Sequence, residues 1–592
     1  MTGHQNRLSR FWQELKRRRV IHVITVYASA AFVIIELIGN LTEPLNLPAG
    51  LSTIVIIVLA VGFPLAIVLS WLYDLTSGSF ERTKPIEDIP EEEKIKVPNA
   101  WKIATYVSFV VIAGLIVLNI AARSDLIKPG MIQSMVVLPF DNYTGDENLE
   151  YVAAGMHASL IGDIGKVSAL RVIGKTSSNV YKETDKSAPD IAKELNVDMV
   201  LEPTLTCYGD TVCILVRAIA NFPEEKQIWV AEYSEDKTKI VSLWNRITKQ
   251  IAEQVMVELT PKEEQLLSNS LTINKEAYDS YLMGIYLLED FNLESLNKAR
   301  KYLSSAIEKN PNWGTLYASM AQVWMTLVQM NYESPEIAGP KIFENLNKAL
   351  ELDPENAYVH FTNGMTAFLT EWDWEKAEME LLKALAANPN DAMSRVIYAQ
   401  LLGCLQRTDE ALTQGQMAIE LDPLNPMIQA LYGSVLMNKG DFEAALAIGE
   451  KVTEGDPGNL MGNTLIEFAA FYRRDYDKVF EATKYVLTPQ GVDFNEVEII
   501  FEETGFIAAY EEILRQLEVL AQKKYVQPFE LVYRYMMVDQ PDKAMEWIEK
   551  GFEVRDPVMP YLGTQGFLCE PIFDDPRFIE FLHKMNLPLP KN

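Results

Sequence analysis

The stretch that decides the fold is a repeated motif, ALTQGQMAIELDP at residues 411–423 and ALAIGEKVTEGDP at residues 445–457. Alanine, glycine, a small apolar residue and proline recur at equivalent positions, about 34 residues apart. A period of this length is typical of a helix–turn–helix unit, in which small residues let helices approach closely and proline ends the second helix. Such units bury their apolar faces only by stacking on each other.

Working outward from this pair, we count about six units between Tyr278 and Leu487. The pattern resembles a tetratricopeptide repeat (TPR) array, which implies an all-α solenoid over residues 275–490. Beyond Asp493 the spacing loosens, and we expect residues 491–592 to form a helical region that caps the solenoid.

TPR geometry implies that the first helix of each unit lines a concave surface. The predicted lining is apolar and rich in methionine, which suits an adaptable peptide site. The candidate protein-binding groove consists of Tyr358, Phe361, Met365, Phe368, Met393, Val396, Gln400, Met427, Ser434 and Met437. An alternative interpretation is that many of these side chains simply pack between units, and the pattern favours neither.

Three apolar segments precede this region, at residues 20–41, 51–73 and 103–122. Each is long enough to cross a bilayer, since about 20 apolar residues suffice. Basic residues within residues 1–19 and in the loop at residues 74–102 predict that both lie in the cytoplasm. We therefore expect a three-helix anchor over residues 20–122 in a bacterial inner membrane, with the later domains in the periplasm.

Residues 133–260 change to a mixed α/β pattern, in the order β-α-β-α-β-β-β-α. The blocks that carry a resemblance lie at residues 135–142, 155, 170–178, 192–202 and 228–229. They resemble the TolB amino-terminal-like domain. This resemblance implies an envelope protein that assembles with others, and it brings no catalytic residues.

Cys207 and Cys213 flank a predicted hairpin turn. One interpretation is a disulfide across the two strands, which is possible outside the cytoplasm. The other is a pair of ordinary core thiols, and the sequence leaves both open.

Composition and motifs exclude several classes of function. The chain holds 82 acidic and 53 basic residues, a net charge of −29, which argues against binding nucleic acid. The five histidines are scattered and match no metal-binding spacing. The run Gly174-Lys175-Thr176 lacks the earlier glycine of a phosphate-binding loop, because that position is Ala169. We therefore expect no enzyme activity, no metal and no cofactor.

The predicted fold class is multi-domain: three transmembrane helices, a small mixed α/β domain, then an all-α TPR solenoid. This layout resembles bacterial membrane-anchored TPR proteins with a TolB-like domain. Some relatives carry a nucleotide cyclase before the membrane part, but only about 19 residues precede the first segment here, too few for a folded domain. We expect a non-enzymatic scaffold that binds a protein partner through its groove in the periplasm.

The alternative is a sensory component that signals through the membrane helices to a separate cytoplasmic effector. Glu36 in the first segment and the acidic loop at residues 87–93 motivate it.

Overall fold

The computed structural model describes residues 27, 31, 63, 73–76, 79–82, 132–221, 226–268, 271–564 and 566–590. The chain divides into two compact units, residues 1–129 and residues 130–592. In the first unit, strands β1 (Tyr73–Thr76) and β2 (Ser79–Arg82) pair in antiparallel orientation. The rings of Tyr27 and Phe63 in the same unit have centroids 5.6 Å apart.

The prediction of a three-helix membrane anchor is corrected by the structure. Within the described ranges, no helix is both long and apolar enough to cross a bilayer. For example, α13 (Pro335–Leu352) buries one face but exposes Glu336, Lys341 and Glu344, because it packs on one side only. Tyr73, the predicted end of the second span, lies in a strand.

The predicted fold class is therefore wrong in its three transmembrane helices, and the multi-pass inner-membrane localisation that followed from them is corrected with it. Apart from Tyr27, Ala31, Phe63 and Tyr73, the predicted spans at residues 20–41, 51–73 and 103–122 lie outside the described residues. The same is true of residues 1–19, Glu36 and the acidic loop at residues 87–93.

The second unit begins with a mixed sheet, as the alternating pattern predicted. Its strands run in the order β5-β3-β6-β7-β8, with β4 beside β6. β3 pairs in parallel with β5 and β6 because helices carry the chain between them, whereas β6, β7 and β8 form an antiparallel meander. The strands are β3 (Ser134–Val137), β4 (Asp141–Asn142), β5 (Arg171–Val172), β6 (Met199–Tyr208), β7 (Thr211–Ala220) and β8 (Lys226–Asp236). The helices are α5 (Glu150–Ile164), α6 (Lys175–Asn179), α7 (Ala188–Leu195), α8 (Ile240–Gln254) and α9 (Pro261–Leu266).

Antiparallel helix pairs follow the sheet, which confirms the predicted repeat array. Six consecutive pairs run from α10/α11 to α20/α21. They are α10 (Lys275–Leu288), α11 (Leu293–Lys309), α12 (Gly314–Gln329), α13, α14 (Ala357–Thr366), α15 (Trp374–Ala387), α16 (Ala392–Cys404), α17 (Thr408–Leu421), α18 (Pro426–Asn438), α19 (Phe442–Gly455), α20 (Leu460–Tyr472) and α21 (Tyr476–Leu487). A π-helical turn, η6 (Ala367–Glu371), extends α14.

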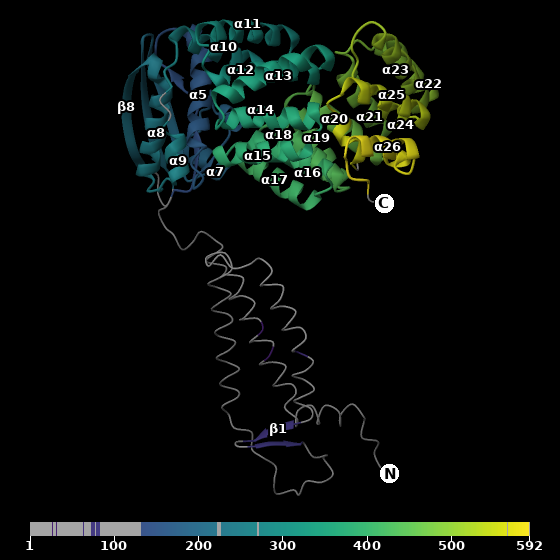
Figure 1. The fold of residues 1–592 in the computed structure, drawn as a ribbon, viewed down its shortest axis with the longest axis horizontal. Coiled ribbons are helices and arrows are strands. Elements are labelled where there is room, and N and C mark those ends of the chain that lie inside the picture. Colours follow the sequence, from purple (N-terminus) through teal and green to yellow (C-terminus); the bar gives the residue numbers. More distant parts are fainter. Residues whose placement is uncertain are drawn as a thin grey trace. The chain divides into compact units, whose positions relative to one another are not determined.

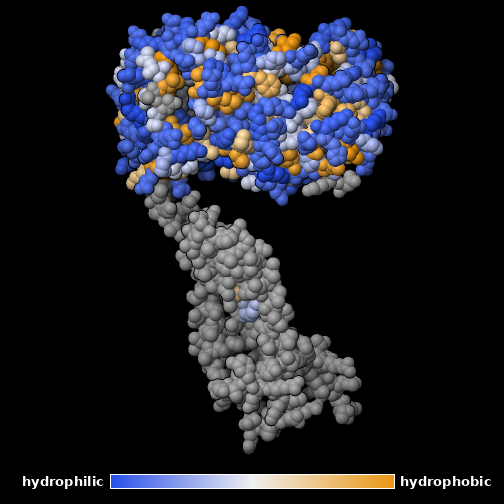
Figure 2. Space-filling model, viewed as in Figure 1, coloured by the Kyte–Doolittle hydropathy of each residue, from blue (hydrophilic) through white to orange (hydrophobic). Residues whose placement is uncertain are grey.

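The remaining helices follow the sixth pair. They are α22 (Phe494–Thr504), α23 (Phe506–Ala521), α24 (Pro528–Met537), α25 (Pro541–Val554), η7 (Met559–Gly563), η8 (Glu570–Ile572) and α26 (Pro576–Lys584). Figure 1 shows the sheet at one end of this unit, next to α5 and α10, and α26 near the other end. On the face shown in Figure 2, hydrophilic residues dominate and hydrophobic ones are scattered among them.

Local chemistry explains the spacing of the repeats. From the third pair onward, the first helix begins at a side chain that accepts a hydrogen bond from a backbone N–H of the first turn. These capping residues are Asn356, Asp391, Asn425 and Asn459. The recurring glycines allow close approach: a Cβ at Gly415 would lie 2.6 Å from Tyr432 Cδ2, and one at Gly449 would lie 2.8 Å from Ile466 Cγ1.

The sheet and the first repeats share one hydrophobic core. Buried side chains of α10, including Ala277, Tyr278 and Leu282, pack into the same cluster as the sheet residues Val137 and Leu201. Leu282 approaches α5 so closely that a Cβ at Gly155 would lie 2.5 Å from its Cδ2. The α/β region therefore covers the apolar end of the first repeat.

A buried ion-pair network joins the last repeat to α24. Glu467 and Arg534 are both fully buried, with 3.2 Å between Glu467 Oε1 and Arg534 Nη2. The Glu467 carboxylate also accepts hydrogen bonds from the hydroxyls of Thr483 (2.8 Å) and Tyr533 (3.3 Å). Arg534 pairs with Glu530 as well. Desolvation raises the pKa of Glu467, and the positive charge of Arg534 opposes this effect.

We predict that Arg534→Met lowers the free energy of unfolding by about 3–5 kcal/mol, because it leaves buried Glu467 without its counter-ion. Chemical denaturation of the full chain, followed by circular dichroism, measures this change. The matched control is Arg515→Met, which removes an exposed pair with Glu512 and should cost at most about 1 kcal/mol. An equal loss of unfolding free energy in the two variants would contradict the stabilising role of the buried Glu467–Arg534 pair.

Candidate functional site

The inner face of the array carries a polypeptide in this structure, and that polypeptide belongs to the chain itself. We call residues 555–590 the C-terminal segment, and we call the surface of α14, η6, α16, α18 and α20 that contacts it the inner face. The contacts lie at the carboxyl ends of these helices. For example, a Cβ at Gly566 would lie 2.8 Å from Met437 Cβ at the end of α18, and Leu568 N donates to Tyr472 Oη at the end of α20 (2.9 Å).

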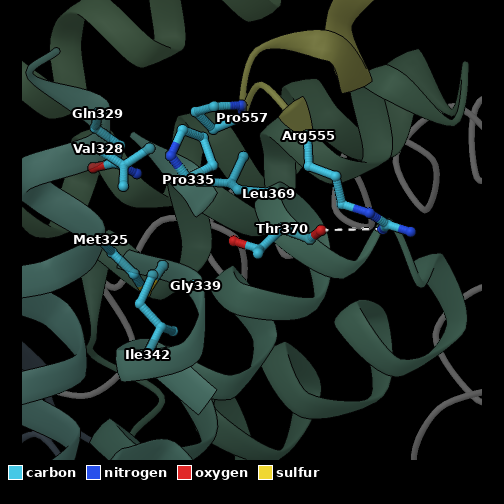
Figure 3. A pocket seen from close by; sticks show the side chains of 10 residues that line it. All are labelled: Met325, Val328, Gln329, Pro335, Gly339, Ile342, Leu369, Thr370, Arg555 and Pro557. Atoms are coloured by element: carbon cyan, nitrogen blue, oxygen red, sulfur yellow. Dashed lines mark hydrogen bonds between the residues drawn. The ribbon is translucent and has the colours of Figure 1, made fainter. Parts of the chain in front are cut away.

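Arg555 attaches the start of this segment to the π-helical turn. Its Nη1 donates to the carbonyl oxygens of Thr370 (3.3 Å) and Glu371 (2.9 Å), and its guanidinium lies 4.9 Å from the ring centroid of Trp372. Figure 3 shows Arg555 and Pro557 lying next to Leu369 and Thr370. A cavity of about 20 Å³, room for roughly one water molecule, lies between these residues and the side chains of α12 and α13.

The end of the segment is held by side chains that bind main-chain carbonyls. Trp374 Nε1 donates to the carbonyl oxygen of Met585 at 2.8 Å. Gln406 Nε2 donates to the carbonyl oxygens of Pro588 (3.3 Å) and Leu589 (2.8 Å). Carbonyl groups are common to every polypeptide, so these contacts recognise a backbone rather than a particular sequence.

Apolar side chains complete the attachment. Phe578 and Leu582 are fully buried, and Met585 and Leu587 are nearly so. Tyr561 packs on Phe368 with ring centroids 5.9 Å apart. Phe567 likewise packs on Phe468 of α20, with ring centroids 5.4 Å apart. By contrast, α26 packs on α25, where the ring centroids of Phe581 and Phe552 lie 5.7 Å apart.

Some of the predicted groove residues are buried in the core, and the others are half-buried. Phe361, Met365, Phe368, Val396, Gln400 and Met437 are buried. Tyr358, Met393, Met427 and Ser434 are half-buried. Gln400 and Ser434 bond each other (3.1 Å) and link α16 to α18, because Gln400 Nε2 also donates to the Leu431 carbonyl (2.7 Å). The contacts made by Trp374, Gln406 and Arg555 were not predicted. Trp374 begins the outer helix α15, Gln406 follows α16 and Arg555 follows α25, so none of them lies within an inner helix, where the repeat pattern places the groove.

The opposite ends of the inner helices meet the α/β region. Asp422, in the turn before α18, accepts hydrogen bonds from Ser177 N (2.8 Å) and Ser177 Oγ (2.5 Å). Gly174 N donates to the Leu421 carbonyl (2.7 Å), and Val172 N donates to Asn390 Oδ1 (2.9 Å). Desolvation raises the pKa of Asp422, and the hydrogen bonds from Ser177 oppose it.

The run Gly174–Ser178 is thus a docking element for the repeat turns. A Cβ at Gly174 would lie 2.5 Å from Asp422 Cγ, so this position requires glycine for close approach.

Cys207 and Cys213 lie opposite each other in β6 and β7, with their Cα atoms 4.8 Å apart, and the structure joins them in a disulfide. Cys404 and Cys569 are free and buried. Within the described ranges, no three His, Cys, Asp or Glu side chains gather as a metal-binding group.

Comparisons with known proteins give a partial match. No family model matches this chain, so the TolB-like assignment stays a prediction. A putative adenylate cyclase 3 of Rhizobium meliloti (strain 1021) is 30% identical over 239 residues. The match takes in 40% of this chain and 39% of that protein, so the chain spans about two-fifths of the relative's length.

Solved structures that resemble this chain include repeat proteins. Pseudomonas aeruginosa PilF is 17% identical, with a TM-score of 0.28 over 39% of this chain and 98% of that one. A thermophilic TPR protein of Thermus thermophilus is also 17% identical, with a TM-score of 0.27 over 36% and 99%. Yeast Tom70 is 14% identical, with a TM-score of 0.31 over 58% and 81%. At these scores the likeness carries no argument about function.

We predict that Gly174→Ala destabilises the chain by about 1–3 kcal/mol, because the added methyl group overpacks the contact with Asp422. Chemical denaturation measures the change. Gly162→Ala in α5 is the control: no atom lies within 4 Å of its added Cβ, and alanine favours a helix by up to about 1 kcal/mol. A Gly174→Ala variant as stable as Gly162→Ala would contradict the docking role.

We also predict that denatured, unreduced protein exposes two reactive thiols, Cys404 and Cys569, and that reduction raises the number to the full four cysteines. Titration with a thiol reagent checks this. Cys207→Ser should add one reactive thiol before reduction, because it releases Cys213. Four thiols without reductant would show that the disulfide does not form.

Proposed function

We propose that this chain is a protein-binding scaffold whose repeat array takes a polypeptide partner on its inner face. The observation that carries the proposal is that this face holds a polypeptide in the structure, the chain's own C-terminal segment. Trp374 and Gln406 bind its main-chain carbonyl oxygens, and the buried apolar side chains of the inner helices contact its apolar residues.

The chemistry of this face suits binding rather than reaction. The groups that contact the segment are the indole of Trp374, the amide of Gln406, the phenol of Tyr472 and apolar side chains, which form hydrogen bonds or pack but are poor nucleophiles at neutral pH. Repeat arrays generally use such extended faces to bind proteins. A non-enzymatic scaffold is the function that these groups support best.

A regulatory role beside a separate enzyme is a second candidate. The favouring observation is the 30% identity with a putative adenylate cyclase over 239 residues, which are only 39% of that protein. Shared sequence of this extent is compatible with a common non-catalytic part. In this case the partner on the inner face would be the enzyme or a protein that controls it.

The proposal is tested by site-specific photo-crosslinking in the native cell. A photoreactive residue replaces Leu405 or Lys439, at the carboxyl ends of the inner helices α16 and α18, or Met379, which is 48% exposed on the outer helix α15. We expect adducts with one distinct protein from the two inner positions and none of that protein from Met379. The same adducts from all three positions, or none from the inner pair, would contradict the proposal.

A further inference from the structure

The sheet of the α/β region ends in a long edge strand. β8 spans 11 residues and is the last strand in the order β5-β3-β6-β7-β8. Among the described residues, it pairs with β7 on one side and with no strand on the other. Figure 1 shows it at the outer margin of the sheet. An edge of this kind presents a row of backbone groups that can pair with another strand.

One hydrogen bond fixes which backbone groups of β8 face outward. Lys237 N donates to the carbonyl oxygen of Asp210 at 3.0 Å. Along an antiparallel pair, residues alternate between bonding to the neighbouring strand and pointing away from it. The odd-numbered residues from 229 to 235 therefore bond to β7. Val230, Glu232 and Ser234 direct their N–H and C=O groups to the free side, and within the described ranges these groups have no hydrogen-bond partner.

A second hydrogen bond gives the same phase independently. Asn221 N donates to the carbonyl oxygen of Asp198 at 2.9 Å, so the odd-numbered residues of β7 bond to β6 and the even-numbered ones bond to β8. Val216 is one of the latter and lies opposite Ala231. Ala231 is thus bonded on its β7 side, and on its free side it occupies a non-hydrogen-bonded position.

The sequence of β8 is self-complementary about Ala231. If two copies pair in antiparallel orientation with the two-fold axis at this residue, Trp229 of each copy lies opposite Tyr233 of the other. Aromatic pairs across strands are stabilising, and Trp229 is only half-buried in the single chain. The same orientation brings Lys226, at the start of one strand, beside the acidic residues 235–236 at the end of the other.

Other registers are less favourable. An axis between two residues would set outward groups opposite groups that already bond to β7. An axis at Glu232 would place two carboxylates directly opposite each other, which is destabilising. An axis at Val230 would place each Trp229 opposite Ala231 and lose both aromatic pairs. The axis at Ala231 is therefore the favoured one.

We propose that this chain forms a symmetric dimer in which two copies of β8 pair about Ala231 and join the two sheets into one. Val230 of each copy and Glu232 of the other exchange hydrogen bonds through their outward backbone groups. The partner at this edge is a second copy of the chain. This inference does not rest on the proposed function, because β8 belongs to the α/β region and not to the inner face.

Oxidative crosslinking of the full chain tests the position of the axis. Ala231→Cys places a cysteine opposite its own copy, where Cα atoms in a non-hydrogen-bonded pair lie about 4.5 Å apart, a distance that a disulfide spans. We expect a covalent dimer on a non-reducing gel, and reductant should reverse it. The control is Lys226→Cys: the side chain is exposed, but at about 3.4 Å per residue its two copies would lie roughly 30 Å apart. Crosslinking of neither variant, or of Lys226→Cys as fully as Ala231→Cys, would overturn the proposal.

A proline substitution tests whether the backbone of the edge forms the contact. Glu232→Pro removes an N–H that points away from β7, so β8 keeps its bonds to β7 but loses a donor toward a second copy. Sedimentation equilibrium should give twice the monomer mass for the unmodified chain and for Glu232→Ala, which keeps the N–H, but the monomer mass for Glu232→Pro. Circular dichroism checks that Glu232→Pro still folds; if it does not, the crosslinking of Ala231→Cys decides. A monomeric unmodified chain at its highest soluble concentration, or a folded and dimeric Glu232→Pro chain, would overturn the proposal.

Discussion

Every later feature of this molecule depends on one constraint: a helix pair in a repeat array can bury its apolar face only against another element. An interior pair has neighbours on both sides, but the first pair, the last pair and the inner face do not. The chain covers each of them with its own residues. The sheet region packs on the first pair, as Gly155 against Leu282 shows, and the elements after α21 cover the other end. The C-terminal segment then covers the inner face.

The α/β region and the C-terminal segment contact the inner helices at opposite ends. The turns before α16 and α18 bind the α/β region through Asn390 and Asp422, whereas the carboxyl ends of η6 and α16 bind the C-terminal segment through backbone carbonyls and side-chain donors. A helix fixed at both ends presents a rigid surface between them. Folding of the chain already orders this surface, so a ligand that binds there causes little further loss of conformational entropy.

Local sequence patterns predicted the helices and strands, but they did not predict the long-range contacts between them. The motif at residues 411–423 and 445–457 located the helix pairs, because small residues, caps and prolines act within one repeat. By contrast, Ser177 meets Asp422 across 245 residues, and Trp374 meets Met585 across 211 residues. The periodicity of the sequence contains no information about contacts between such distant residues. The predicted groove list shows the same limit: spacing placed Phe368 on an inner helix, but only the folded chain shows Tyr561 packed on its ring. The membrane prediction relied on the length of three apolar segments alone. Most of these segments lie outside the described residues, and no helix within the described ranges is long and apolar enough to cross a bilayer.

The contacts with the C-terminal segment combine two kinds of interaction that differ in selectivity. Donors such as Trp374 Nε1 and Gln406 Nε2 accept any peptide backbone, so alone they would give weak and general binding. Because the chain's own C-terminal segment contacts this face, a partner that binds there has to compete with that segment. Apolar contacts, such as Tyr561 on Phe368 and Phe567 on Phe468, add a preference for particular side chains that the contacts with carbonyl groups lack.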